Sequence, residues 1–409
     1  MRSSSCTVLD LGSTKVACLV AEADEEGGMD VIAAATVPCK GMRKGAVVDM
    51  DETARAIDSA VRKLQADGAN VGPLVVAVGG QHIDGCTSQG FVPIYPRSRT
   101  ITREDVLQVV KHSRQLMIPP DREQIQVLPG EFRIDGQRGI KKPLGMSGGK
   151  LEVTSYIVTG QIAHLQNLEK VVEMHGRRVA EMVLLPLASG LGVLSPDEME
   201  HGVVVADIGG SSTDIAVLVG GGLVYAASVP VGGALVSSDI LKLLKTSPEE
   251  AERLKVSYGH AKADLVPEAE KVDVLQLGQT EARPLQRRVL CEIIESRMRE
   301  LAVLIRQQMQ RSGFFGMLPA GLVLTGGGSR LPGSKECFEE VLQHIKVRTG
   351  SPRVGGDHGK TTDTPEMATA VGLARFALGM SEDELTTVDG IGDWKDRIKT
   401  FWSLLSGRA

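Results

Sequence analysis

The chain has few aromatic residues and no long apolar run. Aromatic side chains make up 3% of its 409 residues, and both tryptophans, Trp394 and Trp402, lie near the C-terminus. No stretch approaches the ~18 uninterrupted apolar residues of a membrane-spanning helix. The N-terminal MRSSSCTVLDLG leads directly into a strand pattern, without the apolar core of a signal peptide. We therefore expect a cytoplasmic body whose membrane contact, if it has one, is local.

Cysteine usage and charge exclude further classes of protein. The 6 cysteines are scattered without a C-x-x-C pair, which argues against a disulfide framework or a zinc site and favours reduced thiols packed as small apolar residues. A formal net charge of −5 argues against a nucleic-acid-binding protein. With 42% hydrophobic and 24% charged residues, the composition is that of a globular chain long enough for two or more cores.

What the sequence does contain is an internal repeat. VLDLGSTKVACLV (8–20) and VADIGGSSTDIAVLV (205–219) share an apolar strand, an aspartate, a glycine, small hydroxyl residues and a second β-rich strand. PLVVAVGGQHIDG (73–85) and AGLVLTGGGSRLPG (320–333) each lead an apolar strand into a glycine turn. Helices are predicted over 51–65, 162–175, 248–256, 285–310 and 365–378. We expect two similar α/β halves with buried sheets.

Two segments do not follow this repeat. Residues 83–162 form a β-rich, glycine-punctuated stretch in which Thr102 and Asp105 predict a helix start, so we expect an inserted subdomain there. Residues 381–392 are acidic, have few large apolar side chains and are typical of a linker.

The aspartate loops predict phosphate binding. Glycine and hydroxyl residues leave backbone N–H groups free to face phosphate oxygens, and Asp10 and Asp207 at the strand ends can hold Mg²⁺ through water. Lys15 adds a positive charge. One such loop is more often a plain turn; the prediction depends on two loops in matched positions. The candidate residues are Asp10, Gly12, Ser13, Thr14, Lys15, Asp207, Gly209, Gly210, Ser211, Ser212 and Thr213.

These motifs resemble those of the actin superfamily, whose members bind a nucleotide in a cleft between two similar domains. DLGSTK and DIGGSSTD are similar to its two phosphate loops, and LTGGGSRLPG is similar to its adenosine loop, which nominates Gly326, Gly327, Gly328 and Ser329. AERLK (251–255) resembles the helix beside the ribose and adenine, which nominates Glu252 and Lys255. The alternative interpretation of Glu252 and Lys255 is a solvated i,i+3 pair.

Over its whole length the chain resembles the FtsA family of bacterial cell-division proteins. The resemblance runs through LDLGSTKVACLVAE, KGMRKGAVVDMDETARAIDSAV, LQRRVLCEIIESRMREL and EMATAVGLARFALG. It implies binding of ATP and Mg²⁺, self-association into filaments, and attachment of the tubulin-like FtsZ to the cytoplasmic face of the membrane at the division site. It also implies recruitment of later division proteins through the inserted subdomain. Arg283 and Arg297 match the basic positions that bind the C-terminal peptide of FtsZ; alternatively they are surface arginines of a basic stretch.

The resemblance also implies a domain plan. We expect subdomain 1A over 1–82, 163–195 and 365–380, inserted subdomain 1C over 83–162, subdomain 2A over 196–236 and 311–364, subdomain 2B over 237–310, the linker over 381–392 and a membrane-targeting helix over 393–409.

The last 17 residues, DWKDRIKTFWSLLSGRA, predict an amphipathic helix. On a helical wheel the apolar side chains fall within an arc of about 100°, with basic residues at its edges. From Asp393 to Leu405 the helix would be only about 20 Å long, too short to cross the ~30 Å hydrocarbon core, so we expect it to lie flat on anionic lipid. The alternative is a helix docked on the body. The candidate membrane residues are Trp394, Lys395, Arg397, Ile398, Phe401, Trp402 and Leu405.

No hydrolytic residue is evident. The segment LLPLASGLGVL (184–194) offers only Ser189 as a polar side chain to orient water, so we expect ATP turnover to be slow or absent. Two alternatives remain at this point. A small-molecule kinase of the same superfamily would need a catalytic aspartate and a substrate pocket, which the sequence does not identify. A pilus-assembly relative such as PilM would not need the amphipathic tail.

Overall fold

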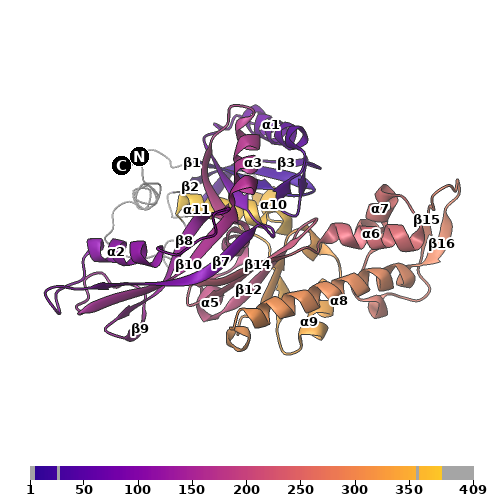
Figure 1. Cartoon of the computed structure of the whole chain (residues 1–409). Helices are drawn as coiled ribbons and strands as arrows, with labels where there is room; N and C mark the ends of the chain where they lie inside the picture. Colours follow the sequence, from indigo (N-terminus) through magenta and orange to yellow (C-terminus); the bar gives the residue numbers. More distant parts are fainter. Residues whose placement is uncertain (1–4, 25–27, 356–358, 380–409) are drawn as a thin grey trace.

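Two five-stranded sheets of the same topology form the body of the molecule (Figure 1). The structure, a computed structural model, describes residues 5–24, 28–355 and 359–379. The sheet orders are β11-β6-β1-β2-β3 and β14-β13-β12-β17-β18. In each sheet three consecutive strands form an antiparallel meander, and two later strands add in parallel beside the first. This shared topology confirms the predicted duplication.

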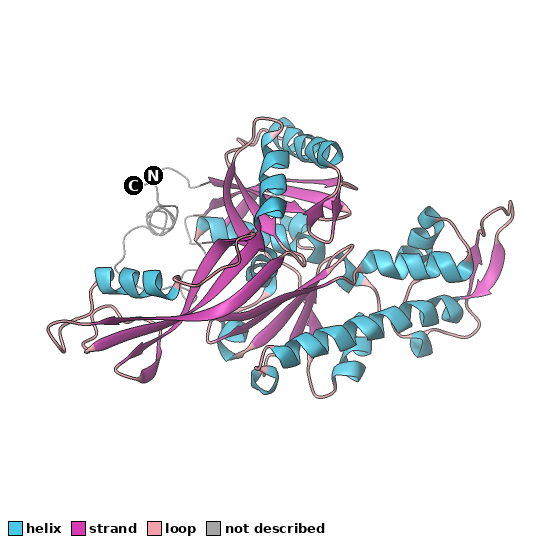
Figure 2. Cartoon of the chain, in the orientation of Figure 1, coloured by secondary structure: helices cyan, strands magenta, loops and turns pink. Residues whose placement is uncertain are grey.

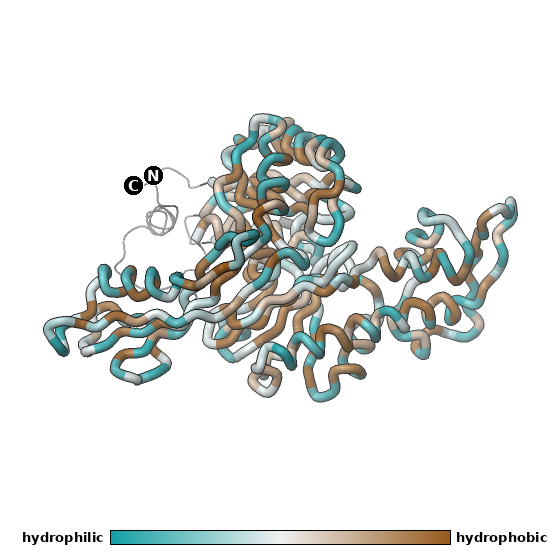
Figure 3. The backbone as a smooth tube through the Cα atoms, viewed as in Figure 1, coloured by the Kyte–Doolittle hydropathy of each residue, from teal (hydrophilic) through white to brown (hydrophobic). Residues whose placement is uncertain are grey.

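The strands of the first sheet are β1 (Ser5–Leu11), β2 (Lys15–Ala23), β3 (Met29–Pro38), β6 (Leu74–Val78) and β11 (Val179–Leu184). Those of the second are β12 (Val203–Ile208), β13 (Thr213–Val219), β14 (Gly222–Val229), β17 (Leu322–Thr325) and β18 (Val347–Thr349). The central strands are buried on both faces, which explains their uninterrupted apolar sequences (Figure 3).

Helices cover both faces of the first sheet (Figure 2). Helix α1 (Met50–Ala66) begins at Asp49, whose carboxylate accepts a hydrogen bond of 2.9 Å from the Glu52 N–H, and it buries Ile57, Val61 and Leu64 in the core on one face. Helix α3 (Ile162–Glu173) lies on the same face, and α11 (Ala368–Leu378) packs on the other. The sheet is therefore covered on both sides, as the sequence predicts.

Helices α5 (Pro196–His201), α8 (Arg287–Arg311) and α9 (Ser334–Leu342) contact strands of the second sheet. Helices α6 (Gly233–Leu244) and α7 (Pro248–Tyr258) pack against each other and against α8, and the two-stranded sheet of β15 (Lys271–Val274) and β16 (Arg283–Gln286) adjoins them. Shorter helical turns are η1 (Ala263–Leu265), η2 (Phe315–Met317), η3 (Gly327–Arg330), α10 (Gly359–Thr362) and η4 (Pro365–Met367).

Two helix predictions need correction, and helices α4 (Leu185–Val193), α5, α6 and α9 were not predicted. Leu285 and Gln286 belong to strand β16, so the long helix begins only at Arg287. The segment predicted from residue 365 starts as the 3₁₀ turn η4 before α11. Helix α4 was missed because it is apolar all round and carries no amphipathic period.

The insertion forms a separate four-stranded sheet of order β7-β10-β8-β9 with its own core. Its elements are β7 (Ile83–Pro93), α2 (Arg103–Ser113), β8 (Arg122–Ile134), β9 (Gln137–Ile140) and β10 (Lys150–Gln161). The predicted helix start is confirmed: the Thr102 N–H donates to the Asp105 carboxylate at 2.8 Å. This sheet and the arm built from α6, α8, β15 and β16 project from opposite ends of the body (Figure 1).

Candidate functional site

The two aspartate loops have the same backbone conformation. Each loop joins the first strand of a five-stranded sheet to its antiparallel partner. In the first, the Gly12 N–H donates to the Lys15 carbonyl at 2.9 Å; in the second, the Gly209 N–H donates to the Ser212 carbonyl at 3.0 Å. The repeat seen in the sequence is therefore a repeat of three-dimensional structure.

The structure brings the two loops together, although nearly 200 residues separate them. A Cβ atom placed on Gly210 would lie 2.6 Å from Thr14 Cγ2 and 2.8 Å from Ser13 Oγ. At contacts of that length, any larger residue at position 210 would displace the Ser13 and Thr14 side chains of the first loop. The predicted residues of both halves thus line one common site.

Both predicted aspartates are buried at this site, each with 8% of its surface exposed. Burial raises the pKa of Asp10 to about 7, while the Lys15 ammonium opposes the shift. Burial also raises the pKa of Asp207, and hydroxyl groups of Ser189 and Thr369 that bond its carboxylate oppose that shift. The site therefore favours cationic partners that restore the charged form of these carboxylates.

A third buried carboxylate was missed by the sequence analysis. Asp214 lies directly opposite Asp207 in the β12–β13 ladder and is only 6% exposed. Burial raises its pKa to about 6, and the Gly80 N–H donates to Asp214 Oδ1 at 3.0 Å. The Ser228 hydroxyl approaches Asp214 without reaching good hydrogen-bond geometry. The signal was present in DIGGSSTD, because a four-residue loop between paired strands places its flanking aspartates opposite each other.

The third glycine loop adjoins the same site. A Cβ atom on Gly326 would lie 2.1 Å from Asp207 Oδ1. Lys15 Nζ donates to the Glu366 carbonyl at 2.8 Å, and the Glu366 carboxylate pairs with Arg330 at the end of the loop. Burial lowers the pKa of Lys15, against the opposing effect of the neighbouring carboxylates. Lys15 therefore links the first loop to the third.

Of the two residues nominated on α7, Lys255 reaches the start of α6, which adjoins the second loop. Lys255 Nζ pairs with Glu252 at 2.7 Å, as the i,i+3 alternative predicts. It is also largely buried, with 16% of its side chain exposed, and donates to the Gly233 carbonyl at 3.2 Å. The Gly233 N–H in turn donates to the Gly209 carbonyl at 3.0 Å. The ion pair thus stands beside the phosphate-loop backbone.

Not every predicted hydroxyl is free to meet a ligand. Thr213 is fully buried and its hydroxyl donates to the Val231 carbonyl at 2.7 Å. Ser329 donates to the Gly326 carbonyl at 2.7 Å. Ser211 accepts the Lys44 N–H at 2.7 Å, so its donor remains available. Thr213 and Ser329 therefore stabilise the loops they belong to.

No group of three His, Cys, Asp or Glu side chains within the described ranges is arranged to ligate a metal directly. Asp10 and Asp207 therefore suit a Mg²⁺ ion that keeps its water shell and is held through those water molecules. Two buried carboxylates with the Lys15 ammonium nearby suit a hydrated cation bound to phosphate.

Arg283 and Arg297 lie away from this site, on the projecting arm. Arg283 begins strand β16 and is exposed. Arg297 lies on α8, where its guanidinium bonds Asp239 of α6 at 2.7 and 3.0 Å and pairs with Glu300. An acidic partner must therefore compete with Asp239 for Arg297.

All seven predicted membrane residues, from Trp394 to Leu405, fall outside the described part of the chain. Within that part, no helix has the length and apolar character needed to cross a bilayer.

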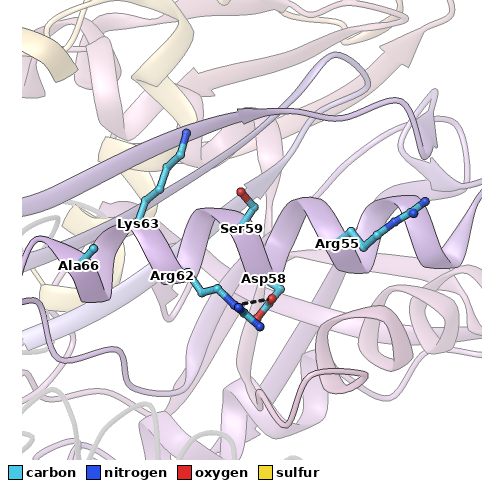
Figure 4. A pocket seen from close by; sticks show the side chains of 6 residues that line it. All are labelled: Arg55, Asp58, Ser59, Arg62, Lys63 and Ala66. Atoms are coloured by element: carbon cyan, nitrogen blue, oxygen red, sulfur yellow. Dashed lines mark ion pairs between the residues drawn. The ribbon is translucent and has the colours of Figure 1, made fainter.

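A shallow hollow on α1 is unrelated to the loops (Figure 4). Arg55, Ser59, Arg62 and Lys63 line it, all from this single helix, and Arg62 pairs with Asp58 at 2.7 Å. Their side chains point in different directions and do not converge on a common point. The hollow is a solvated helix face.

Comparison with protein families gives two matches. Residues 204–372 match the model of "Cell division protein FtsA". Residues 80–159, which contain the inserted sheet, match the model of the "SHS2 domain inserted in FTSA".

Solved structures share the fold at low sequence identity. A PilM–PilN type IV pilus biogenesis complex matches with a TM-score of 0.64 and 16% identity, covering 91% of this chain and 98% of that one. MreB5 of Spiroplasma citri bound to ADP matches with a TM-score of 0.56 and 12% identity, covering 93% and 98%. Both likenesses concern the fold alone and confirm that it is actin-like.

Curated relatives match over nearly the whole chain. The cell division protein FtsA of Pseudomonas aeruginosa is 36% identical, covering 92% of this chain and 90% of the relative. FtsA of Escherichia coli K12 is 34% identical with 96% of both chains covered, and FtsA of Bacillus subtilis is 34% identical, covering 90% and 82%. With its duplicated actin-like halves and the inserted SHS2 domain, the chain belongs to the FtsA family of cell division proteins.

Proposed function

We propose that this protein binds Mg-ATP between its two halves and uses the bound state to control self-association, while its C-terminal helix tethers FtsZ to the membrane. The observation that carries the nucleotide part is the meeting of the two phosphate loops at Gly210 and Thr14. Each loop presents backbone N–H groups, and Asp10 and Asp207 stand at their bases.

Substitution of Gly210 tests this site directly. In Gly210→Val the added side chain collides with Ser13 and Thr14. The two loops then cannot come close enough to bind the phosphate groups of one nucleotide. We expect Mg-ATP binding to be lost in titration calorimetry while the far-UV circular dichroism stays unchanged. Gly316→Val is the matched control, because a Cβ there meets nothing within 4 Å. Unchanged affinity in a folded Gly210→Val variant would exclude this site.

Slow turnover is part of the proposal. Ser189, the polar side chain that the sequence offered for orienting water, has no exposed surface, and its hydroxyl lies 2.6 Å from Asp207 Oδ2. It is therefore engaged by a carboxylate and unsuited to direct an attacking water. In this proposal the bound nucleotide controls the conformation of the protein, and its hydrolysis is secondary.

The tethering part rests on the family and on the shape of the chain. Arg283 and Arg297 on the arm are the proposed contacts for the acidic C-terminal peptide of FtsZ, and residues 393–409 are the proposed membrane helix. The inserted sheet and the arm project from opposite ends (Figure 1). That arrangement suits a head-to-tail contact between copies, which propagates into a filament. Later division proteins are proposed to bind the inserted sheet.

A further inference from the structure

Two crossing helices carry the chain between the halves. Helix α4 leads from β11 of the first sheet toward β12 of the second. The chain returns to the first sheet at Gly355, which bridges Asp30, and α11 then packs on β1, β2 and α4. Both helices are almost entirely buried. Any change in the angle between the halves must therefore bend or rotate this pair.

The crossing is made by small residues in backbone contact. A Cβ atom on Gly372 would lie 1.7 Å from the Ala188 carbonyl oxygen, and one on Gly192 would lie 2.2 Å from the Ala368 carbonyl oxygen. Each helix thus contributes an alanine and a glycine four residues apart. Two backbones this close have no intervening side chains to absorb a movement, so a shift of one helix is passed to the other.

A hydrogen-bonded triad joins this crossing to the candidate nucleotide site. Asp207 Oδ2 lies 2.6 Å from Ser189 Oγ of α4 and 2.9 Å from Thr369 Oγ1 of α11, and the two hydroxyls are 2.9 Å apart. Ser189 and Thr369 directly follow Ala188 and Ala368, the residues at the crossing. Their exposed fractions are 0% and 3%, so water does not compete for these bonds.

The two carboxylate oxygens of Asp207 have different surroundings. Oδ2 takes both hydroxyl bonds, while Oδ1 lies against the Gly326 turn of the third loop. One carboxylate therefore contacts the loop that the proposed function assigns to adenosine and both helices that connect the halves. A hydroxyl hydrogen bond to an ionised acceptor is stronger than one to a neutral acceptor, so a bound cation that ionises Asp207 strengthens both bonds.

We propose that Ser189 and Thr369 are positioning residues that couple occupancy of the nucleotide site to the angle between the halves, by holding Asp207 to the α4–α11 crossing. The inference rests on the proposed function for its ligand. When Mg-ATP orders the loops around Asp207, the two hydroxyls transmit that ordering to both connecting helices. Conversely, a partner that rotates the halves shifts Asp207 and changes the affinity for nucleotide.

Thr369→Val and Ser189→Ala test the connection. Valine keeps the shape of threonine and alanine leaves the smallest void, so each variant removes a hydroxyl with little change in packing. We expect Mg-ATP to bind threefold to tenfold more weakly in calorimetry, since each variant removes one hydrogen bond to the Asp207 carboxylate. Thr369→Ser retains the hydroxyl and should restore the affinity.

Hydrogen exchange measured by mass spectrometry at saturating Mg-ATP separates coupling from a merely structural role. In the unaltered chain we expect nucleotide to slow amide exchange both in the loops at residues 10–15 and 207–213 and in α4 and α11. In either variant, slowing should remain in the loops and be lost in the helices. The matched control is Ser113→Ala with Ser155→Ala, a buried pair of hydroxyls 2.8 Å apart in the inserted sheet and α2, which should leave both effects intact.

The outcomes are distinguishable. If Mg-ATP protects α4 and α11 equally in the variants and the unaltered chain, the coupling inference is overturned while nucleotide binding stands. If the unaltered chain shows no protection of the loops and no heat of binding, the proposed function fails, and the coupling fails with it.

Discussion

Asp10 and Asp207 occupy equivalent positions in the two halves but have different partners. The Asp207 carboxylate bonds two buried hydroxyls and faces Asp214 across the ladder. Ala17 stands at the position opposite Asp10, so the first half has no counterpart of Asp214. Two carboxylates directly opposite on neighbouring strands repel each other, which is a cost that a bound cation would remove.

The raised pKa of Asp10 predicts a pH dependence of stability without ligand. Because the folded-state pKa of about 7 exceeds the usual 3.8, the protonated form favours the fold. The stabilisation is complete below pH ~4 and is lost as the pH rises through about 7, by up to ~4 kcal/mol in the unfolding free energy. Asp10→Asn lacks this titration.

Denaturant unfolding of both proteins between pH 4 and 8, without Mg²⁺ or nucleotide, measures this effect. The stability of the unaltered chain should fall relative to that of Asp10→Asn across this window. A difference that stays constant with pH would show that Asp10 titrates normally.

At the scale of elements, the contact between α6 and α8 controls how available Arg297 is. Asp239 of α6 holds the Arg297 guanidinium with two hydrogen bonds and raises its pKa. Arg283 on β16 is exposed and has no ion-pair partner within the described part of the chain. The two arginines are therefore expected to contribute unequally to binding an acidic peptide.

If Arg283 and Arg297 bind the FtsZ peptide, substitutions of Arg283 and of Asp239, the partner of Arg297, should change the affinity in opposite directions. Arg283→Glu should weaken binding at least tenfold, since each charge-assisted contact contributes about 1.5–3 kcal/mol. Asp239→Asn should strengthen binding, because it frees Arg297 from its internal partner. Fluorescence anisotropy of a labelled peptide measures both, and an unchanged affinity in both variants would move the site elsewhere.

For residues 393–409, the expected membrane binding is predicted from the sequence alone. Half-burial of Trp394, Phe401 and Trp402 offers several kcal/mol at about 25 cal/mol per Å², and helix ordering offsets much of it. We expect weak, reversible binding by one tail and firm binding by a filament of tails. Anionic vesicles should shift the fluorescence of both tryptophans to the blue.

Trp402→Glu places a charge in the centre of the apolar stripe and should release the protein from pelleted vesicles while Mg-ATP binding persists. Deletion of residues 393–409 is the second comparison, and FtsZ should co-sediment only with the intact chain. Equal pelleting of all three proteins, without a blue shift, would mean that the helix docks on protein.

At the scale of the whole molecule, the two buried helices α4 and α11 cross in backbone contact between the halves. Gly372→Ala puts a methyl group against the Ala188 carbonyl, at a distance no real contact adopts. We expect the unfolding free energy to fall by ~3 kcal/mol or more, as for overpacked cores. Thermal unfolding followed by circular dichroism measures this, with Gly316→Ala as control. Equal melting temperatures would show that the helices can separate at no cost.

The sequence alone was sufficient to predict the duplication and the matched aspartate loops, whereas the amphipathic tail stays a prediction. An aspartate followed by a glycine turn between apolar strands is a local pattern, and its repetition after about 200 residues is visible without any contact being known. Helix α1 was predicted from the sequence too, because the apolar period of Ile57, Val61 and Leu64 is a short-range feature.

Only the tertiary structure decided which of these residues share a site. Helix α4 is uniformly apolar because it is buried on all sides, so no period revealed it. Ser189 had been considered for orienting water, but the crossing with α11 turns its hydroxyl to Asp207. Asp214 and Arg297 likewise acquire their environments from partners on other elements. Propensity and periodicity act over a few residues, whereas the close approach of Gly210 to Thr14 depends on how two separately folded sheets pack.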